Sequence, residues 1–110
     1  MTFTVIVLPR AESDIALNAE WWAENRSLEQ AIEWTIAIQA KIESLAESPA
    51  RCRLARENAQ FDREIRQLLV GIGNHLTHRV LFTIRDETVF VLTVRSNRQD
   101  EVASDDVDVP

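Results

Sequence analysis

Two apolar runs close together near the end of the chain constrain its fold more than any other feature of the sequence. Leu76–Ile84 and Val89–Val94 are rich in β-branched residues and lie on either side of the polar dipeptide Asp86-Glu87. A short polar break between two runs of this kind indicates a β-hairpin. A third run of the same character, Ile65–Val70, precedes them. The sequence therefore predicts three consecutive antiparallel strands in this half of the chain.

The first half of the chain predicts one strand followed by two helices. Phe3–Leu8 is a short apolar run that fits a buried strand, and Pro9 follows it at a position where proline commonly opens a helix. Apolar residues then recur at spacings of three and four to about residue 25, which is the period of an amphipathic helix. Ser27 and Gln30 have the form of a capping box for a second helix, which we expect to end before Pro49.

This order of elements predicts an α+β fold with the topology β-α-α-β-β-β, in which a helical hairpin packs on one face of a small, mainly antiparallel sheet. A chain of 110 residues fits a single domain, which we place at residues 1–99. Residues 100–110 contain five acidic residues and no basic residue. We expect this last segment to be a partly disordered acidic tail.

The net charge of −6 conceals an uneven distribution of charge along the chain. Residues 1–50 contain three basic and eight acidic residues, whereas residues 51–99 contain nine arginines and five acidic residues. Such asymmetry indicates interaction surfaces rather than a particular fold. The single cysteine, Cys52, excludes an internal disulfide and fits a reducing compartment. No apolar run approaches the length of a membrane span, so we expect a cytoplasmic protein with no membrane contact.

Three tryptophans on the predicted helical hairpin are candidates for binding a partner. Trp22 lies on the apolar stripe of the first helix, whereas Trp21 and Trp34 lie beside the stripes of their helices. Either these rings border the core, or one of them belongs to a partner-binding groove, since exposed tryptophan is a common interface anchor. Arg51 and Arg53 are further candidates, because the connection that carries them is longer than most.

The residues expected to face the core from the second helix are Leu28, Ala31, Ile32, Thr35, Ile38, Ile42 and Leu45.

The one acid–base element that the residues offer is the pair of His78 and Arg95. A two-residue hairpin loop would place them opposite each other. A neighbouring guanidinium favours the neutral imidazole, which suits a base; the alternative is a half-buried histidine at the end of a strand. Two histidines and one cysteine lack the spacing of metal ligands, and we expect no metal or cofactor. The cross-strand pairs expected from this register are Ile84 with Val89, Arg79 with Val94 and His78 with Arg95.

Three short motifs follow one another along the predicted strands: Arg-x-Leu at Arg66–Leu68, His-Arg-x-x-Phe at His78–Phe82, and Val-x-x-Val-Arg at Val91–Arg95. In this ordered combination the chain resembles the RelE/ParE superfamily of toxins, which are often labelled plasmid stabilisation proteins. The resemblance covers residues 1 to about 100. The β-α-α-β-β-β order of that superfamily agrees with the order predicted above from periodicity.

The resemblance implies the toxin of a type II toxin–antitoxin module, which a cognate antitoxin protein holds inactive. RelE-like members cut messenger RNA on the ribosome, with Arg and Lys neutralising phosphate and a C-terminal Tyr or His assisting proton transfer. ParE-like members poison DNA gyrase instead. This chain has no Tyr, its only lysine is Lys41, and Ser96 stands where many relatives have His. Without a general acid or base, metal-free RNA cleavage loses about 10²–10⁴-fold in rate.

We therefore expect a ParE-like toxin that acts by binding, with DNA gyrase as its target. Two alternatives stay open, namely a ribosome-dependent mRNA endonuclease and an inactive member of the family. In the endonuclease, the resemblance assigns catalysis to Arg66, Arg79, Arg95 and His78. The net negative charge of the whole chain slightly disfavours the ribosome as the target, since ribosome binders need a face that neutralises phosphates.

Overall fold

Four strands, two long helices and three short 3₁₀ helices make up the computed structural model, which describes residues 2–72, 75–97, 106–107 and 109–110. The long elements of the first half are β1 (Thr4–Val7), α1 (Pro9–Asn25) and α2 (Leu28–Glu43). The 3₁₀ helices are η1 (Ser44–Ala46), η2 (Pro49–Arg51) and η3 (Asn58–Gln60), and the remaining strands are β2 (Arg66–Ile72), β3 (His75–Arg85) and β4 (Thr88–Ser96).

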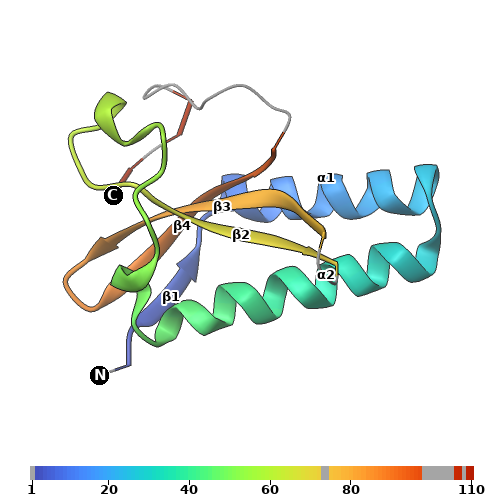
Figure 1. Cartoon of the computed structure of the whole chain (residues 1–110), viewed down its shortest axis with the longest axis horizontal. Coiled ribbons are helices and arrows are strands. Elements are labelled where there is room, and N and C mark those ends of the chain that lie inside the picture. Colours follow the sequence, from blue (N-terminus) through green and yellow to red (C-terminus); the bar gives the residue numbers. More distant parts are fainter. Residues whose placement is uncertain (1, 73–74, 98–105, 108) are drawn as a thin grey trace.

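The strands form one mixed sheet in the order β1-β4-β3-β2. β1 runs parallel to β4, whereas the β2–β3 and β3–β4 pairs are antiparallel. The two long helices form a hairpin that packs against one face of this sheet (Figure 1). The predicted α+β fold, with its β-α-α-β-β-β order and its mainly antiparallel sheet, is confirmed.

Local capping residues set the helix boundaries. Pro9 is the first residue of α1, where its missing N–H costs no hydrogen bond. Ser27 caps α2, and its side-chain oxygen accepts the backbone N–H of Gln30 at 3.1 Å. α2 ends at Glu43 and continues as a single 3₁₀ turn, so the α-helix stops earlier than the end expected from Pro49. None of the helices within the described ranges is long and apolar enough to cross a membrane.

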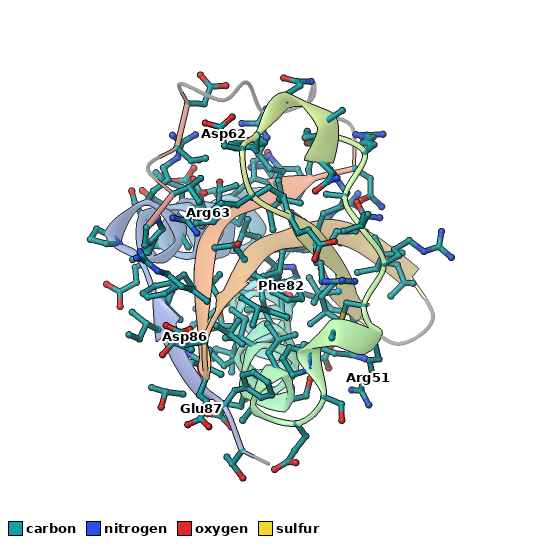
Figure 2. All side chains as sticks on the ribbon, turned by 90° about the vertical axis from the view of Figure 1, so that its left-hand side faces the viewer. Arg51, Asp62, Arg63, Phe82, Asp86 and Glu87 are labelled. Carbon is teal, nitrogen blue, oxygen red and sulfur yellow. The ribbon has the colours of Figure 1, made fainter. Side chains whose placement is uncertain are left out.

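The main core lies between the helical hairpin and the sheet. Trp34 and Ile38 of α2 and Phe82 of β3 have no exposed surface in it. Figure 2 shows Phe82 in the middle of the molecule, whereas Asp86 and Glu87 lie at the tip of the β3–β4 hairpin. The other buried members of the main core are Ala11, Ile42, Leu45, Val70, Val80, Val89, Val91 and Val94.

The buried stripe of α2 differs from the expected one. Leu28 is 67% exposed and Ile32 is 52% exposed, whereas Trp34, which we expected beside the stripe, is completely buried. The prediction was right for Ala31, Ile38, Ile42 and Leu45. It was wrong for Leu28 and Ile32, because α2 carries apolar residues on two adjacent faces, and periodicity alone does not show which of them meets the sheet. The stripe that does so consists of Ala31, Trp34, Ile38 and Ile42, and Leu45 continues it in η1.

The turn between β3 and β4 has the predicted two-residue loop. Asp86 adopts a left-handed backbone with a φ of 55°, a conformation that Asp tolerates better than most residues. Arg85 pairs with Thr88 next to the turn, and Ile84 pairs with Val89 one position farther on, so this part of the expected register is confirmed.

A β-bulge changes the register farther from the turn. Phe82 pairs with Val91, but Leu81 pairs with Thr93, so Leu92 is one extra residue in β4. The expected pairs beyond this point were wrong, because strict alternation of faces cannot anticipate an inserted residue. The observed pairs are Val80 with Val94, Arg79 with Arg95 and His78 with Ser96, in place of the expected Arg79 with Val94 and His78 with Arg95.

A second, smaller apolar cluster covers the helix-free face of the sheet. Its buried members include Leu81 and Leu92, each 1% exposed, and Val107, 9% exposed. Val107 belongs to the segment that we expected to be a partly disordered acidic tail. Most of that segment, residues 98–105 and 108, lies outside the described residues, but its described end packs on the sheet near the connection between α2 and β2 (Figure 1). The other members are Ala55, Ile65, Leu8, Phe61, Phe90 and Val109.

We expect Ile38→Ala to lower the free energy of unfolding by about 2–5 kcal/mol, because it leaves a cavity in the main core. Ile36 lies two residues earlier in the same helix but is 62% exposed, and Ile36→Ala should change the free energy by less than about 0.5 kcal/mol. Chemical denaturation of the two variants measures both values. Similar losses for both variants would contradict the orientation of α2 described above.

Candidate functional site

A groove with a volume of about 780 Å³ opens between α1 and the adjoining ends of β3 and β4. One wall is a face of α1, on which residues three and four apart lie next to each other. The other wall comes from the start of β3 and the end of β4. Among the residues that line the groove are Asp14, Asn18, Trp21, Trp22, His78 and Arg95.

The rim of the groove combines an exposed aromatic ring with arginines. Trp21 is 48% exposed, and its ring meets that of Trp22 edge to face, with 5.4 Å between the ring centroids. Trp22 is half-buried and packs against the main core, so it supports the exposed ring. Arg26 and Arg95 also line the groove. Tryptophan and arginine are enriched in protein-binding surfaces, and this rim has that composition.

His78 lies in the groove wall with both ring nitrogens engaged. Its Nε2 lies 2.8 Å from Oδ1 of Asn18, and its Nδ1 lies 2.8 Å from Oγ1 of Thr77. Asn18 donates its Nδ2–H to the backbone oxygen of Asp14 at 2.7 Å, so its Oδ1 is the atom that accepts. His78 therefore donates from Nε2, and its Nδ1 accepts the hydroxyl hydrogen of Thr77.

Burial lowers the pKa of His78 below its ordinary value, because a buried site disfavours the charged imidazolium. The residue is 6% exposed, and the ring of Trp34 lies 5.1 Å away, centroid to centroid. The imidazole is therefore neutral near pH 7 and already holds one donor and one acceptor within the protein. This arrangement favours a structural role for His78 over that of a general base.

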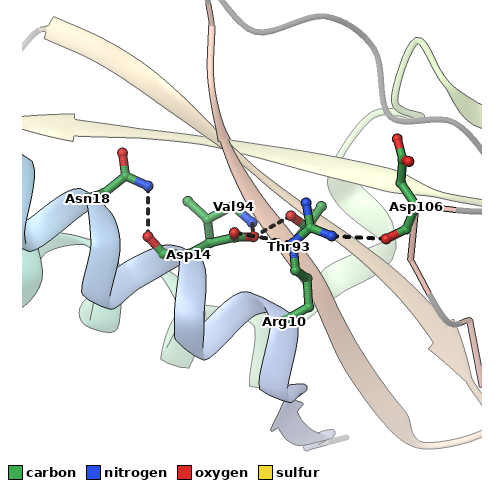
Figure 3. A network of polar contacts seen from close by, with 6 residues as sticks. All are labelled: Arg10, Asp14, Asn18, Thr93, Val94 and Asp106. Atoms are coloured by element: carbon green, nitrogen blue, oxygen red, sulfur yellow. Dashed lines mark hydrogen bonds and ion pairs between the residues drawn. The ribbon is translucent and has the colours of Figure 1, made fainter.

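Asp14 fastens α1 to the end of β4. Its carboxylate accepts the hydroxyl hydrogen of Thr93 and the backbone N–H of Val94, the latter at 3.0 Å. Arg10 donates from Nε to the other carboxylate oxygen at 3.3 Å, and from a terminal nitrogen to the backbone oxygen of Asp106 at 3.0 Å. Figure 3 shows that these contacts join α1, β4 and the described end of the chain. The sequence did not reveal this network, because no local pattern marks Asp14 as a residue that bonds to β4.

Arg79 lies on the helix-free face of the sheet, where Glu57 forms a buried ion pair with it. The guanidinium donates to both carboxylate oxygens, at 2.9 and 2.7 Å, and also to Oε1 of Gln67 at 3.1 Å. The side chain of Arg79 is 4% exposed and that of Glu57 is not exposed. Such two-point pairing combines charge with fixed geometry, and here it ties the connection between α2 and β2 to the sheet. Glu57 gave no sequence signal, since its partner lies 22 residues away.

Arg66 holds the other end of the same connection. Its guanidinium donates to the backbone oxygen of Cys52 at 2.6 Å and to that of Ala50 at 3.2 Å, and it lies 3.4 Å from the carboxylate of Glu64. Burial raises the pKa of the Cys52 thiol, although the nearby Arg51 opposes this shift. A thiol with a raised pKa is a poor nucleophile at neutral pH, so this environment does not favour a nucleophilic role for Cys52.

The structure does not bring the four candidate catalytic residues together. His78 and Arg95 line the groove. Arg79 lies on the opposite face of the sheet with Glu57, and Arg66 bonds to the connection before β2. No shared anion-binding array forms from these side chains.

The candidate partner-binding residues also separate. Trp21 and Trp22 line the groove, whereas Trp34 is buried in the main core and offers no surface to a partner. Arg51 and Arg53 are exposed outside the groove, and Figure 2 shows Arg51 at the edge of the molecule. Within the part of the chain that the structure describes, no three His, Cys, Asp or Glu side chains gather closely enough to hold a metal ion.

Comparisons with known proteins identify relatives of this arrangement. A family model described as the ParE toxin of the type II toxin–antitoxin system parDE matches residues 5–101. The comparison with curated proteins finds no match. Among solved structures, a chain of the chromosomal ParDE toxin–antitoxin system from P. aeruginosa superposes with a TM-score of 0.70 at 12% sequence identity. The alignment covers 86% of this chain and 96% of that chain; at this identity it shows a common fold.

We expect Glu57→Gln to lower the free energy of unfolding by about 3–5 kcal/mol, because it leaves the guanidinium of Arg79 buried without a counter-charge. Glu64→Gln is the matched control. The Glu64 side chain is 70% exposed beside Arg66, and surface ion pairs contribute about 0–1 kcal/mol. Urea denaturation measures both variants. If Glu57→Gln costs no more than Glu64→Gln, the ion pair of Arg79 is not buried in solution.

Proposed function

The chain belongs to the ParE toxin family of type II toxin–antitoxin systems, and on this premise we propose that it is a ParE-like toxin that arrests growth by binding DNA gyrase in the cytoplasm. We propose also that a cognate antitoxin protein neutralises it. Membership of this family supports the assignment of the chain to a toxin–antitoxin module. The surroundings of the arginines support action by binding rather than by catalysis.

The ion pair between Arg79 and Glu57 is the observation that most favours a toxin acting by binding its target over one that cleaves RNA. An arginine that neutralises a phosphate must present its guanidinium to the nucleic acid. Both terminal nitrogens of Arg79 instead donate to a buried carboxylate. Arg66 is also engaged within the protein, His78 is a buried neutral imidazole, and the chain contains no Tyr. These observations support a toxin without a ribonuclease centre.

We propose that the antitoxin occupies the groove beside Trp21. The groove is concave, and a supported, half-exposed indole on its rim has the character of a binding anchor. Arg26 and Arg95 line the same groove, so they favour an antitoxin segment with acidic side chains next to its apolar ones.

One observation supports the alternative function as an mRNA endonuclease, because His78 and Arg95 line the same groove. In that reading, Arg95 would contact phosphate and His78 would move protons after a change in its hydrogen bonds. An inactive member of the family would keep the groove for antitoxin binding alone.

Expression of the chain without an antitoxin should arrest growth, and the purified protein should inhibit supercoiling by DNA gyrase or trap cleaved DNA. A supercoiling assay on relaxed plasmid measures the second effect, and the integrity of cellular mRNA is followed in parallel. Rapid loss of mRNA with unaffected gyrase would replace our proposal by the endonuclease. Normal growth at verified soluble expression would contradict both toxin readings.

We expect Trp21→Ala to weaken binding of the antitoxin, taken as the small protein encoded beside the toxin, by about 30-fold or more, the loss typical of an interface hot spot. Ile36→Ala is the control, because Ile36 is also an exposed apolar residue but lies outside the groove. Isothermal titration calorimetry measures both affinities. A larger loss for Ile36→Ala would place the antitoxin on the outer surface of α2 instead.

A further inference from the structure

A side chain from outside the sheet, the carboxylate of Asp14, forms hydrogen bonds to β4 next to its bulge. A bulge disrupts the hydrogen-bond ladder locally, and the backbone N–H of Val94, two residues after the extra residue Leu92, donates to the carboxylate of Asp14 at 3.0 Å. The hydroxyl of Thr93 donates to the same carboxylate oxygen. Arg95, the next residue of β4, lines the groove. Asp14 therefore holds the stretch of β4 from which Arg95 enters the groove.

Asn18, one helical turn after Asp14, extends this network to His78. It donates to the backbone oxygen of Asp14 at 2.7 Å and accepts from Nε2 of His78 at 2.8 Å. The first contact lies within α1, whereas the second depends on where this part of α1 lies relative to the sheet. The orientation of His78 is thus linked to the position of Asp14.

Arg10 extends the network in the other direction, to the end of the chain. It contacts the carboxylate of Asp14 at 3.3 Å and the backbone oxygen of Asp106 at 3.0 Å (Figure 3). The next residue, Val107, is 9% exposed and packs in the second cluster with Leu81 and other residues of the helix-free face. We call residues 106, 107, 109 and 110 the C-terminal anchor.

The network runs from a buried side chain on one face of the sheet to a groove on the other. Charge-assisted hydrogen bonds are about twice as strong as neutral ones, and the Asp14 carboxylate, with a side chain 15% exposed, accepts three hydrogen bonds. The side chain of Arg10 is 46% exposed, so its ion pair is the weaker step. The burial of Val107 adds apolar contact, which holds Asp106 beside Arg10.

We propose that Asp14 and Arg10 are positioning residues, which couple docking of the C-terminal anchor on the helix-free face to the geometry of the groove. Two sites are coupled when a change at one alters an equilibrium constant at the other, typically by a factor of about 5 to 150. Release of the anchor removes one of the two acceptors of Arg10, the backbone oxygen of Asp106, loosens Asp14 on β4, and changes the positions of Arg95 and His78. This coupling is a property of the protein alone and does not depend on what the groove binds.

Two variants of the whole protein test the coupling from opposite ends. Val107→Asp releases the anchor by placing a charge in the second cluster, and Arg10→Gln breaks the link while Val107 keeps its apolar contacts. The readouts are amide hydrogen exchange at Val94 and the NMR resonances of the His78 ring. We expect both variants to speed exchange at Val94 by about threefold, the effect of losing a partly exposed ion pair, and to shift the His78 resonances.

Three controls make the result specific. Arg85→Gln removes an exposed arginine at the far end of β3 and should leave both readouts unchanged. The amide of Val89, at the turn end of β4, should keep its exchange rate in every variant. Arg10→Lys retains the positive charge beside Asp14 and should restore part of the protection of Val94.

Two results would overturn the proposal. One is an unchanged Val94 amide and His78 ring in Val107→Asp, when exchange at the Val107 position shows that the anchor has been released. The other is equal acceleration at Val94 and Val89, because a uniform loss of protection reports global destabilisation rather than a local link.

Discussion

One extra residue in β4, Leu92, is the constraint on which the arrangement of the groove depends. Beyond a bulge, every side chain changes face relative to strict alternation. Val94 therefore joins the main core under the helices, whereas alternation would place it with Leu92 on the helix-free face. The same change brings the N–H of Val94 to the carboxylate of Asp14. The groove is consequently built where the register departs from the regular ladder.

Burial determines which role the arginines of the sheet can have. A guanidinium in a low-dielectric interior is stable only with a partner. Arg79 has Glu57 as that partner, and Arg66 has the backbone oxygens of Ala50 and Cys52. These arginines bind the long connection between α2 and β2 to the sheet. The sequence motifs that contain them are thus signatures of the fold as much as of a site.

The groove combines a neutral, fully bonded histidine with an exposed indole. His78 lacks a free nitrogen for proton transfer, since Asn18 and Thr77 occupy both of its ring nitrogens. Trp21 offers an apolar surface supported by Trp22. This composition is the basis of our proposal that the groove binds another protein. The Asp14 network places the groove and the C-terminal anchor in one continuous set of contacts, so the two faces of the sheet are mechanically joined.

The sequence by itself determined the order of the elements, the helix caps, the two-residue turn at Asp86 and the resemblance to the toxin superfamily. These features depend on neighbours in the chain, so local patterns record them. Only the tertiary structure decided which apolar face of α2 is buried, where β4 contains a bulge, which carboxylate pairs with Arg79, and that Val107 packs on the sheet. Each of these features results from contacts between residues far apart in the sequence. Such contacts produce no periodic pattern or fixed spacing of residues along the chain, so the sequence alone does not reveal them.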